Sequence, residues 1–572
     1  MPVHNADIEK IFNHIADLLD IEGANQFRVR AYRNAARTVA GHAHSLADMV
    51  QKGEDLTQLS GIGQDLAQKI DEIVQTGTLS MLKDLKERVP SALSDLMHVA
   101  GLGPKRVKTL HQELDVSSLE DLKKVAEQGK IKQLSGFGPK MEQKILDSVG
   151  KTQAHEKRIL LSEAQQFGLP LENFLKSVEG VKDAIIAGSY RRKKETVGDL
   201  DILVTCSEDS PVMDKFTSYE DVQEVVSQGS TRSTVILRSG LQVDLRVVAE
   251  KSYGAALHYF TGSKAHNIAV RKLSLDKDLK INEYGVFKGE QSIAGQTEEE
   301  VYATVGLTYI EPELRENRGE IEAAQENRLP ELVKAEDIKG DLHAHSKATD
   351  GHNTLEEMGQ AAKERGYDYL AITDHSQRLR MVKGLDKKRL RQQIQEIDEL
   401  NKKLAPFVLL KSIEVDILED GSLDLPNEVL NELDLVICSI HHKFNLTKKK
   451  QTERILKAMD NPCFNVLGHP TGRLIGSREA YELDMESILQ DAKDKGCFME
   501  LNAQPERLDL NDVHCMRAKE LGVKVVISTD AHSTGQLDLM EMGLGQARRG
   551  WLRAQDVLNT QSLAGLKKVL KR

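Results

Sequence analysis

The stretch GSYRRKKETVGDLDIL, residues 188–203, decides the fold of the first half of the chain. Asp199 and Asp201 stand two residues apart at the start of an apolar run, which predicts a β-strand with both carboxylates on one face. Asp244, in the later apolar segment LQVDLRV, joins them if the two strands are neighbours. Three carboxylates so close would repel one another unless divalent cations lay between them. The pattern therefore predicts a two-metal site of the kind used in nucleotidyl transfer.

The residues before the two aspartates suit a phosphate group. Gly188 and Ser189 predict a turn with backbone N–H groups and a hydroxyl, and Arg192 adds a guanidinium group. An isolated Asp-x-Asp pair is more often a solvated strand edge, but the upstream Gly-Ser and the later Asp244 make the arrangement more specific. The whole resembles the nucleotidyltransferase fold.

Residues 1–150 show apolar residues at helical spacing and one repeated pattern: LSGIGQDLAQKI (59–70), VAGLGPKRVKTL (99–110) and LSGFGPKMEQKI (134–145). In each copy a Gly-apolar-Gly turn precedes an amphipathic helix, whose first N–H groups can bind phosphate oxygens. The copies resemble the helix-hairpin-helix motif, which binds the DNA backbone, often through a monovalent cation. The alternative, a plain helix cap, accounts for one copy more readily than for three. The glycines concerned are Gly61, Gly63, Gly101, Gly103, Gly136 and Gly138.

The charge of the chain limits how it can bind nucleic acid. The net charge is -11 over 572 residues, and acidic and basic residues nearly balance in 1–150. Local geometry must then replace bulk positive charge in any contact with DNA. The start MPVHNADIEK has no signal-peptide pattern, and no apolar run is long enough to span a membrane. With five widely spaced cysteines, we expect reduced thiols and a cytoplasmic, nucleoid-associated protein of bacterial type.

The second half carries histidines and carboxylates at the ends of predicted strands. After residue 340, apolar runs such as YLAIT and VKVVIST alternate with helical stretches, which favours a parallel α/β barrel. The motifs are DLHAHS (341–346), TDH (373–375), SIEVD (412–416), SIHHKF (439–444), GHPTGR (468–473), MELN (499–502) and STDAH (528–532). One such histidine is usually structural, but chance is a poor account of the whole set. Imidazole with carboxylate suits zinc, manganese or iron and predicts two or three metal ions.

The first half resembles DNA polymerase family X, the beta-like repair polymerases, over about residues 1–311. The resemblance rests on GSYRR…GDLDI, VDLR, HYFTGSKAHNIAVR (258–271) and INEYGVFKG (281–289). It implies gap filling in base excision repair with dNTPs, and two Mg²⁺ or Mn²⁺ ions held by Asp199, Asp201 and Asp244. Core packing is the alternative for the two aromatic residues of HYFTG. The implied nucleotide site is Gly188, Ser189, Arg192, Gly198, Tyr259, Phe260, Thr261, Gly262, Asn267 and Arg271.

Four residues qualify this resemblance. Val197 stands where the family often has a serine on the triphosphate, and Gln242 where it often has an arginine near the primer end. Both put nucleotide affinity or metal preference in doubt. Lys69 falls where lyase members have a Schiff-base lysine, but Asp65 places an acid in the expected 5′-phosphate pocket. A lyase role and an ordinary surface position on a helix both stay open for Lys69.

The second half resembles the PHP (polymerase and histidinol phosphatase) superfamily across residues 339–572. The resemblance implies a distorted seven-stranded barrel and a metal-dependent phosphoesterase with Mn²⁺ or Zn²⁺. Arg473 is a candidate phosphate contact, with a surface salt bridge as the alternative. Nine residues match the family's metal ligands: His343, His345, Asp350, His375, Glu414, His441, His469, Asp530 and His532.

Together these patterns predict a multidomain monomer that acts on gapped or primer-template DNA. The fold is an all-α helix-hairpin-helix region, an α+β nucleotidyltransferase palm with a thumb, and a C-terminal α/β PHP barrel. We expect the PHP domain to be a 3′–5′ exonuclease or 3′-phosphodiesterase, with AP-endonuclease activity as a further option. Two alternatives remain: it acts on small phosphate esters, or it is a metal-stabilised scaffold that positions DNA. The expected boundaries are 1–90 (lyase-type), 91–150 (fingers), 151–250 (palm), 251–315 (thumb), 316–338 (linker) and 339–572 (PHP).

Overall fold

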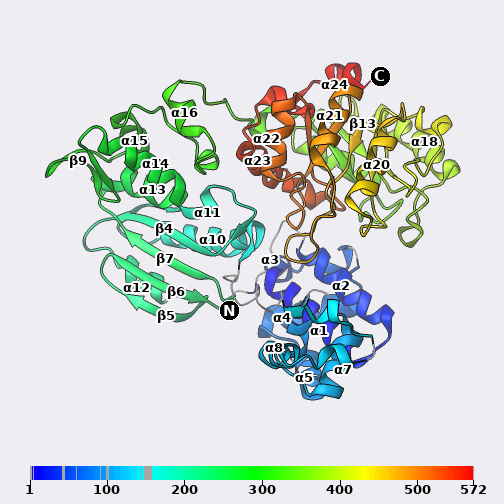
Figure 1. Cartoon of the computed structure of the whole chain (residues 1–572), viewed down its shortest axis with the longest axis horizontal. Coiled ribbons are helices and arrows are strands. Elements are labelled where there is room, and N and C mark those ends of the chain that lie inside the picture. Colours follow the sequence, from blue (N-terminus) through cyan, green and yellow to red (C-terminus); the bar gives the residue numbers. More distant parts are fainter. Residues whose placement is uncertain are drawn as a thin grey trace. The chain divides into compact units, whose positions relative to one another are not determined.

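The computed structural model divides the chain into two compact units (Figure 1). One comprises Met1–Ile159 with Glu220–Gln223 and Leu237–Gly240, and the other comprises the remaining residues. No helix in the described part of the chain is long and apolar enough to cross a bilayer. The five cysteines all lie in that part, and none forms a disulfide. The described residues are 3, 5–40, 46–59, 61–90, 92–97, 99, 102–134, 136–143, 145–146 and 158–570.

The first unit, blue to cyan in Figure 1, is helical, as the spacing of its apolar residues predicts. Along α1 (Asn5–Glu22), Ile8, Phe12 and Ile15 share one face and are fully buried. Pro104 opens α7 (Pro104–Leu114), a position where no intrahelical N–H is needed. Further helices are α2 (Gln26–Ala40), α3 (Leu46–Gln51), α4 (Gln64–Thr76), α5 (Ser80–Arg88), α6 (Ala92–Leu96) and α8 (Leu119–Glu127), with short turns η1 (Leu56–Gln58) and η2 (Ile131–Gln133).

A five-stranded sheet forms the palm, in the order β2-β4-β7-β6-β5. The pair β4 (Asp199–Cys206) and β7 (Gln242–Val247) is parallel, whereas β2 with β4 and β6 with β7 are antiparallel. The other strands are β2 (Val181–Ile186), β5 (Val222–Gln228) and β6 (Arg232–Leu237); β1 (Ile159–Leu160) and β3 (Thr196–Val197) form a separate pair. The palm helices are α10 (Leu161–Lys176), α11 (Gly188–Arg191) and α12 (Val212–Thr217).

The thumb packs helices around a three-stranded sheet in the order β10-β9-β8. Its elements are η3 (Glu250–Ser252), α13 (Tyr253–Thr261), α14 (Lys264–Leu275), β8 (Lys280–Asn282), β9 (Gly285–Lys288), β10 (Gln291–Ala294), α15 (Glu298–Thr304) and η4 (Pro312–Leu314). The segment expected as a linker contains α16 (Glu320–Gln325) and η5 (Ala335–Asp337). Ile321, Ala324 and Leu332 of this segment are buried in the same apolar cluster as the thumb helices.

Seven parallel strands form the C-terminal barrel in sequence order, which confirms the predicted fold. An isolated parallel bridge between Ala344 and Ala531 joins the first strand to the residues after the last, so the barrel is nearly closed. Most strand residues are buried, as expected for parallel strands covered on both faces. The strands are β11 (Gly340–Ala344), β12 (Tyr369–Ile372), β13 (Val408–Asp416), β14 (Leu435–Ser439), β15 (Val466–Leu467), β16 (Phe498–Asn502) and β17 (Val525–Ser528).

The helices of this domain alternate with its strands. They are α17 (Leu355–Glu364), α18 (Lys387–Leu404), α19 (Asn427–Leu430), α20 (Lys448–Met459), α21 (Met485–Lys495), α22 (Asp512–Leu521), α23 (Met540–Arg549) and α24 (Leu563–Leu570). Short turns are η6 (Arg380–Val382), η7 (Thr534–Leu539), η8 (Ala554–Asp556) and η9 (Leu558–Thr560). Trp551, the single tryptophan, follows α23 and packs against the apolar cluster of the thumb.

A buried carboxylate joins the palm to the thumb. Glu298 on α15 accepts two hydrogen bonds from Arg191 of the palm, at 3.0 and 2.8 Å, and a third from Arg315. Arg315 is 0% exposed and lies 5.3 Å from the ring centroids of both Tyr302 and Tyr309. Burial would raise the pKa of Glu298, but Arg315 and Arg191 hold it at about 2, so the carboxylate stays charged.

Replacing Arg315 by alanine should lower the free energy of unfolding by about 3–5 kcal/mol, because it removes a partner of a buried charge. The measurement is urea unfolding followed by Trp551 fluorescence. Arg328→Ala is the matched control, since the Arg328–Glu326 pair is largely exposed and should contribute less than about 1 kcal/mol. Equal effects of the two substitutions would contradict a structural role for the buried pair.

Candidate active sites

The three aspartates of the palm lie together, as predicted. Asp201 and Asp244 are directly opposite each other on the neighbouring strands β4 and β7, and Asp199 precedes Asp201 by two residues on the same face. Gly188 opens α11 with a left-handed φ of 62°, and a Cβ there would lie 2.9 Å from Asp201 Oδ2. Residues 188–192, the turn predicted to bind phosphate, are called the phosphate turn below. Glycine is required at its first position, because that position approaches the carboxylates.

The electrostatics of this triad differ between its members. Burial, followed by the charges of Asp199 and Asp244, raises the pKa of Asp201 to about 7. Burial would also raise the pKa of Asp244, but hydrogen bonds from Thr234, Gln242 and Arg232 hold it below its usual value. The raised pKa of Asp201 shows that three negative charges are unfavourable here without compensation. A divalent cation would supply that compensation.

Gln242 stands where an arginine was expected, and a neighbouring strand supplies a guanidinium group instead. Gln242 Nε2 donates to Asp244 Oδ2 at 2.8 Å, and Arg232 Nη2, from β6, donates to Oδ1 at 3.2 Å. Asp244 therefore keeps a guanidinium neighbour. Val197, the other departure, is fully buried in β3. Sequence reasoning missed Arg232 because nothing near it in the chain marks it.

Several of the predicted nucleotide residues hold one another in place. Arg192 Nη1 donates to the Thr261 carbonyl at 2.7 Å, and Asn267 Nδ2 donates to the Tyr259 carbonyl at 2.7 Å. Arg271 lies 5.0 Å from the centroid of the Tyr259 ring. The Arg192 contact places the last turn of α13 next to the turn that follows α11.

The two aromatic residues at the end of α13 are only partly buried, so neither is a fully enclosed core residue. Tyr259 and Phe260 lie edge to face with ring centroids 5.0 Å apart. Arg246 lies 4.5 Å from the centroid of Phe260. Ser189, in α11, and Gly198, just before β4, flank the triad in sequence. A Cβ at Gly262 would lie 2.4 Å from Asn267 Oδ1, so this turn is tightly packed.

The glycine turns of the first unit have the expected backbone form. Gly61 and Gly136 have φ values of 67° and 83°, which favour glycine. Gly63 and Gly103 cap α4 and α7 without a side-chain hydrogen bond, so the first N–H groups of these helices are left for another acceptor. A Cβ at Gly63, Gly103 or Gly138 would meet nothing within 4 Å, which leaves room for a ligand. Gly101 lies outside the described residues.

Lys69 forms an ion pair with Asp65 one helical turn earlier on α4. Its side chain is largely covered, whereas Asp65 is mostly exposed. The acid predicted in the 5′-phosphate pocket therefore lies against the lysine itself. A Schiff base at Lys69 would require its amino group to leave this carboxylate partner.

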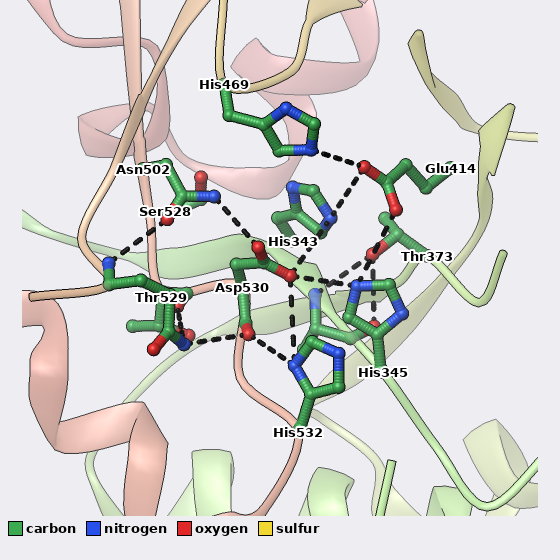
Figure 2. A network of polar contacts seen from close by, with 12 residues as sticks. His343, His345, Thr373, Glu414, His469, Asn502, Ser528, Thr529, Asp530 and His532 are labelled. Atoms are coloured by element: carbon green, nitrogen blue, oxygen red, sulfur yellow. Dashed lines mark hydrogen bonds and ion pairs between the residues drawn. The ribbon is translucent and has the colours of Figure 1, made fainter. Parts of the chain in front are cut away.

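The predicted ligands of the barrel converge at the C-terminal ends of its strands (Figure 2). Ligand atoms lie within 4.8 Å of one another in three groups that share members. His469 is outside these groups, but its Nε2 lies 2.9 Å from Glu414 Oε1. The groups are His345, Asp350, His375 and His532; His343, His345 and Asp530; and His375, Glu414 and His441. All nine predicted residues are thus brought together around positions that could hold metal ions.

The donor atoms of this cluster fit divalent ions. His343 Nε2, His345 Nδ1 and Asp350 Oδ1 are buried and have no hydrogen-bond partner among the described residues. Burial would raise the pKa of Glu414, but the surrounding histidines, first His441, hold it well below its usual value. Buried polar atoms normally have partners, so unsatisfied atoms that face one another are what a metal site requires.

Further residues orient the ligands: Glu500 and Asn502 belong to the MELN motif and Ser528 to STDAH, but the motifs alone do not indicate these contacts. Glu500 Oε1 lies 2.6 Å from His343 Nδ1 and accepts a hydrogen bond from Ser528 Oγ at 2.5 Å. Asn502 Nδ2 donates to Asp530 Oδ2 at 3.0 Å (Figure 2). Such contacts fix the ring orientation of a metal-binding histidine.

Two arginines near the cluster have different surroundings. Arg473 donates to Glu195 of the palm at 2.7 Å and to the carbonyls of Arg507 and Leu508, which is the salt-bridge alternative. Arg507 Nε lies 3.9 Å from Asp530 Oδ2, and its buried Nη1 has no hydrogen-bond partner within the described ranges. The guanidinium group closest to the metal ligands is therefore Arg507 and not the predicted Arg473.

Models of five domain families match the chain. They are a helix-hairpin-helix domain (residues 3–79), a SAM-like helix-hairpin-helix tandem (93–151), the DNA polymerase beta palm (158–270), the DNA polymerase beta thumb (256–316) and the PHP domain (341–504). Among solved structures, a polymerase beta of Leishmania infantum in a "ternary P/T complex" matches with 20% identity and a TM-score of 0.27, covering 39% of this chain and 98% of that one.

Curated relatives cover the whole chain or one half of it. DNA polymerase lambda of Rattus norvegicus is 25% identical over 55% of this chain and 56% of its own length. A probable phosphatase of Thermoanaerobacter sp. (strain X514) is 29% identical over 40% of this chain and 94% of its own length. The DNA polymerase/3′-5′ exonuclease PolX of Bacillus subtilis (strain 168) is 39% identical over 100% of both chains. This full-length identity, with the palm, thumb and PHP models, shows that the chain belongs to DNA polymerase family X, in its bacterial form with a C-terminal PHP domain.

Proposed function

We propose that this protein is a template-directed DNA polymerase that fills short gaps during repair and removes 3′-terminal nucleotides with its PHP domain. The observation that carries the proposal is the presence of two separate carboxylate sites, the triad of β4 and β7 and the cluster of the barrel. The full-length relative named DNA polymerase/3′-5′ exonuclease supports the pairing of activities. We expect Mg²⁺ or Mn²⁺ at the triad, Mn²⁺ or Zn²⁺ at the cluster, and a monomer in the cytoplasm.

At the palm, the chain's own groups orient an incoming dNTP. The N–H groups and hydroxyl of Gly188 and Ser189, with Arg192, would bind the triphosphate. The turn from Tyr259 to Gly262 would lie against the sugar, and Asn267 with Arg271 holds that turn. Bound divalent ions would lower the pKa of the attacking 3′-hydroxyl at the triad and of a water at the cluster, and would neutralise the reacting phosphate at both.

The surroundings of the cluster favour a nucleic acid over a small phosphate ester. Exposed basic residues follow β12 and β14 at the barrel end that carries the ligands: Arg378, Arg380, Lys383, Lys443 and Lys448. Met381, between two of them, is 85% exposed. A small ester needs only a few charges close to the metal ions, whereas a DNA strand meets a wider basic and partly apolar surface. We therefore propose 3′–5′ exonuclease or 3′-phosphodiesterase activity, with cleavage at abasic sites as an extension.

Contacts with DNA outside the two sites are proposed at the glycine turns. The uncapped N-termini of α4 and α7 would bind backbone phosphates without sequence preference, which suits a chain of net negative charge. Lyase activity at Lys69 stays a prediction, because the amino group that would form the Schiff base is paired with Asp65.

Separate substitutions should separate the two activities. Asp201→Asn should lower nucleotide insertion on a gapped duplex roughly 1000-fold and leave 3′ removal intact, while Asp530→Asn should do the reverse. Asp538→Asn, an exposed residue paired with Arg365 away from the ligands, is the control. If Asp530→Asn keeps full 3′ removal on DNA, the PHP domain is a scaffold or acts on another substrate.

The raised pKa of Asp201 makes metal binding pH-dependent. Its folded pKa of about 7 exceeds the reference value of 3.8, so its contribution to stability is present at low pH and is lost as pH rises through 7. Mg²⁺ should offset that loss. The increase in melting temperature on adding Mg²⁺ to chelator-treated protein should therefore be larger near pH 8 than near pH 5.5. In Asp201→Asn this pH-dependent part should vanish, whereas its persistence would assign it to the PHP cluster.

Arg507 is proposed to bind the phosphate at the cluster. Arg507→Ala should lower kcat/KM for 3′ removal by about 10- to 100-fold, because it removes a charged hydrogen-bond donor, and should leave nucleotide insertion unchanged. Arg517→Ala, on the exposed face of α22, is the control. Unchanged 3′ removal in Arg507→Ala would show that this guanidinium does not contact the substrate.

A further inference from the structure

The turn that follows α11 is held directly by helix α23 of the PHP domain. The carbonyl of Arg192 accepts a hydrogen bond from Arg549 Nη1 at 2.8 Å, and the carbonyl of Lys193 accepts one from Gln546 Nε2 at 2.7 Å. A Cβ at Gly545 would lie 3.1 Å from Lys193 Cβ, so the two backbones approach closely. Side chains of the phosphoesterase domain therefore bind two successive carbonyls next to the proposed triphosphate site.

Glu316 extends this contact to the guanidinium group of Arg192. Its Oε1 accepts from Arg192 Nε at 3.0 Å and from Arg549 Nη1 at 3.0 Å. Burial would raise the pKa of Glu316, but the charges of Arg192 and Arg549 hold it below its usual value, so the carboxylate stays charged. Because Arg192 Nη1 is bound to the Thr261 carbonyl, Nη2 is the donor with no partner among the described residues.

Arg549 is itself fixed in place. It is 3% exposed, and its Nη2 donates to Asp512 Oδ2 at 2.7 Å. The same oxygen accepts a hydrogen bond from Arg318 at 2.9 Å. Positive and negative side chains therefore alternate along the contacts from Arg192 to Arg318. A buried arginine with all these contacts has little freedom to move. Its hydrogen bond to Glu316 therefore restricts the position of that carboxylate.

We propose that Arg549 is a positioning residue for nucleotide binding by the polymerase. Through Glu316 and the Arg192 carbonyl, it holds the Arg192 side chain with one N–H pair directed away from these contacts and available to a triphosphate. The inference rests on the proposed assignment of Arg192 to the triphosphate. It makes the PHP domain a structural part of the polymerase site, independently of the metal ions that the PHP cluster binds.

The test uses the full-length protein with Arg549→Ala and Arg549→Lys, assayed for single-nucleotide insertion on a gapped duplex. Arg549→Ala should raise KM for the dNTP about 10- to 100-fold with a smaller change in kcat, because a displaced binding group weakens nucleotide contacts. Arg549→Lys should recover part of the loss. The control is Arg548→Ala: the neighbouring residue pairs with Glu313 of the thumb at 2.7 Å and does not contact the turn. 3′ removal should be unchanged in all three variants.

Trp551 provides a second readout, because it packs against the thumb at the same interface. Its emission should be the same in Arg549→Ala and in the unsubstituted protein. A shift that accompanies the rise in KM, or an equal rise in Arg548→Ala, would overturn the proposal in favour of general separation of the domains. Arg192→Ala separates the role of Arg549 from that of Arg192. If Arg192→Ala raises KM and Arg549→Ala does not, Arg192 binds the triphosphate but Arg549 does not position it. If neither substitution raises KM, Arg192 does not bind the triphosphate.

Discussion

Two carboxylates, the buried Glu298 and the partly buried Glu316, each lie between two guanidinium groups and set the geometry on which the polymerase site depends. Glu298 binds Arg191 and Arg315, and Glu316 binds Arg192 and Arg549. A charge removed from water is tolerated only beside opposite charge, so neither carboxylate can move without its partners. Because Arg191 and Arg192 are consecutive, the phosphate turn is fixed to the thumb by one residue and to the PHP domain by the next.

The same constraint operates at both clusters of acidic groups. In the palm, Asp244 is compensated by protein donors and Asp201 is not, as the pKa of about 7 indicates. In the barrel, imidazole groups surround Glu414 and Asp530, yet several buried ligand atoms still lack partners among the described residues. At both places a divalent cation would complete the charge balance.

The sequence was sufficient to predict the Asp199–Asp201–Asp244 triad and the nine barrel residues, because their motifs stand at strand starts or strand ends and strand order brings such positions together. It could not predict Arg232 beside Asp244 or the Arg549–Glu316 contact, and the MELN motif contains Glu500 without indicating its partner His343. Arg232, Glu316 and Arg549 are single charged residues outside the motifs. For Arg473 the contacts observed are those of the salt-bridge alternative, with Glu195 of the palm and the carbonyls of Arg507 and Leu508. Packing between distant segments decides such pairs.

The seam of the barrel has a consequence for biosynthesis. The bridge between Ala344 and Ala531 joins the first strand to the end of the last, and the metal-ligand positions on its two sides, His343 and His345 on one and Asp530 and His532 on the other, are separated by most of the domain. A ribosome that has completed the palm and thumb has therefore made none of these four ligands, and the set is complete only once His532 has been added. The nascent chain acquires the means to degrade DNA only when most of it has been synthesised.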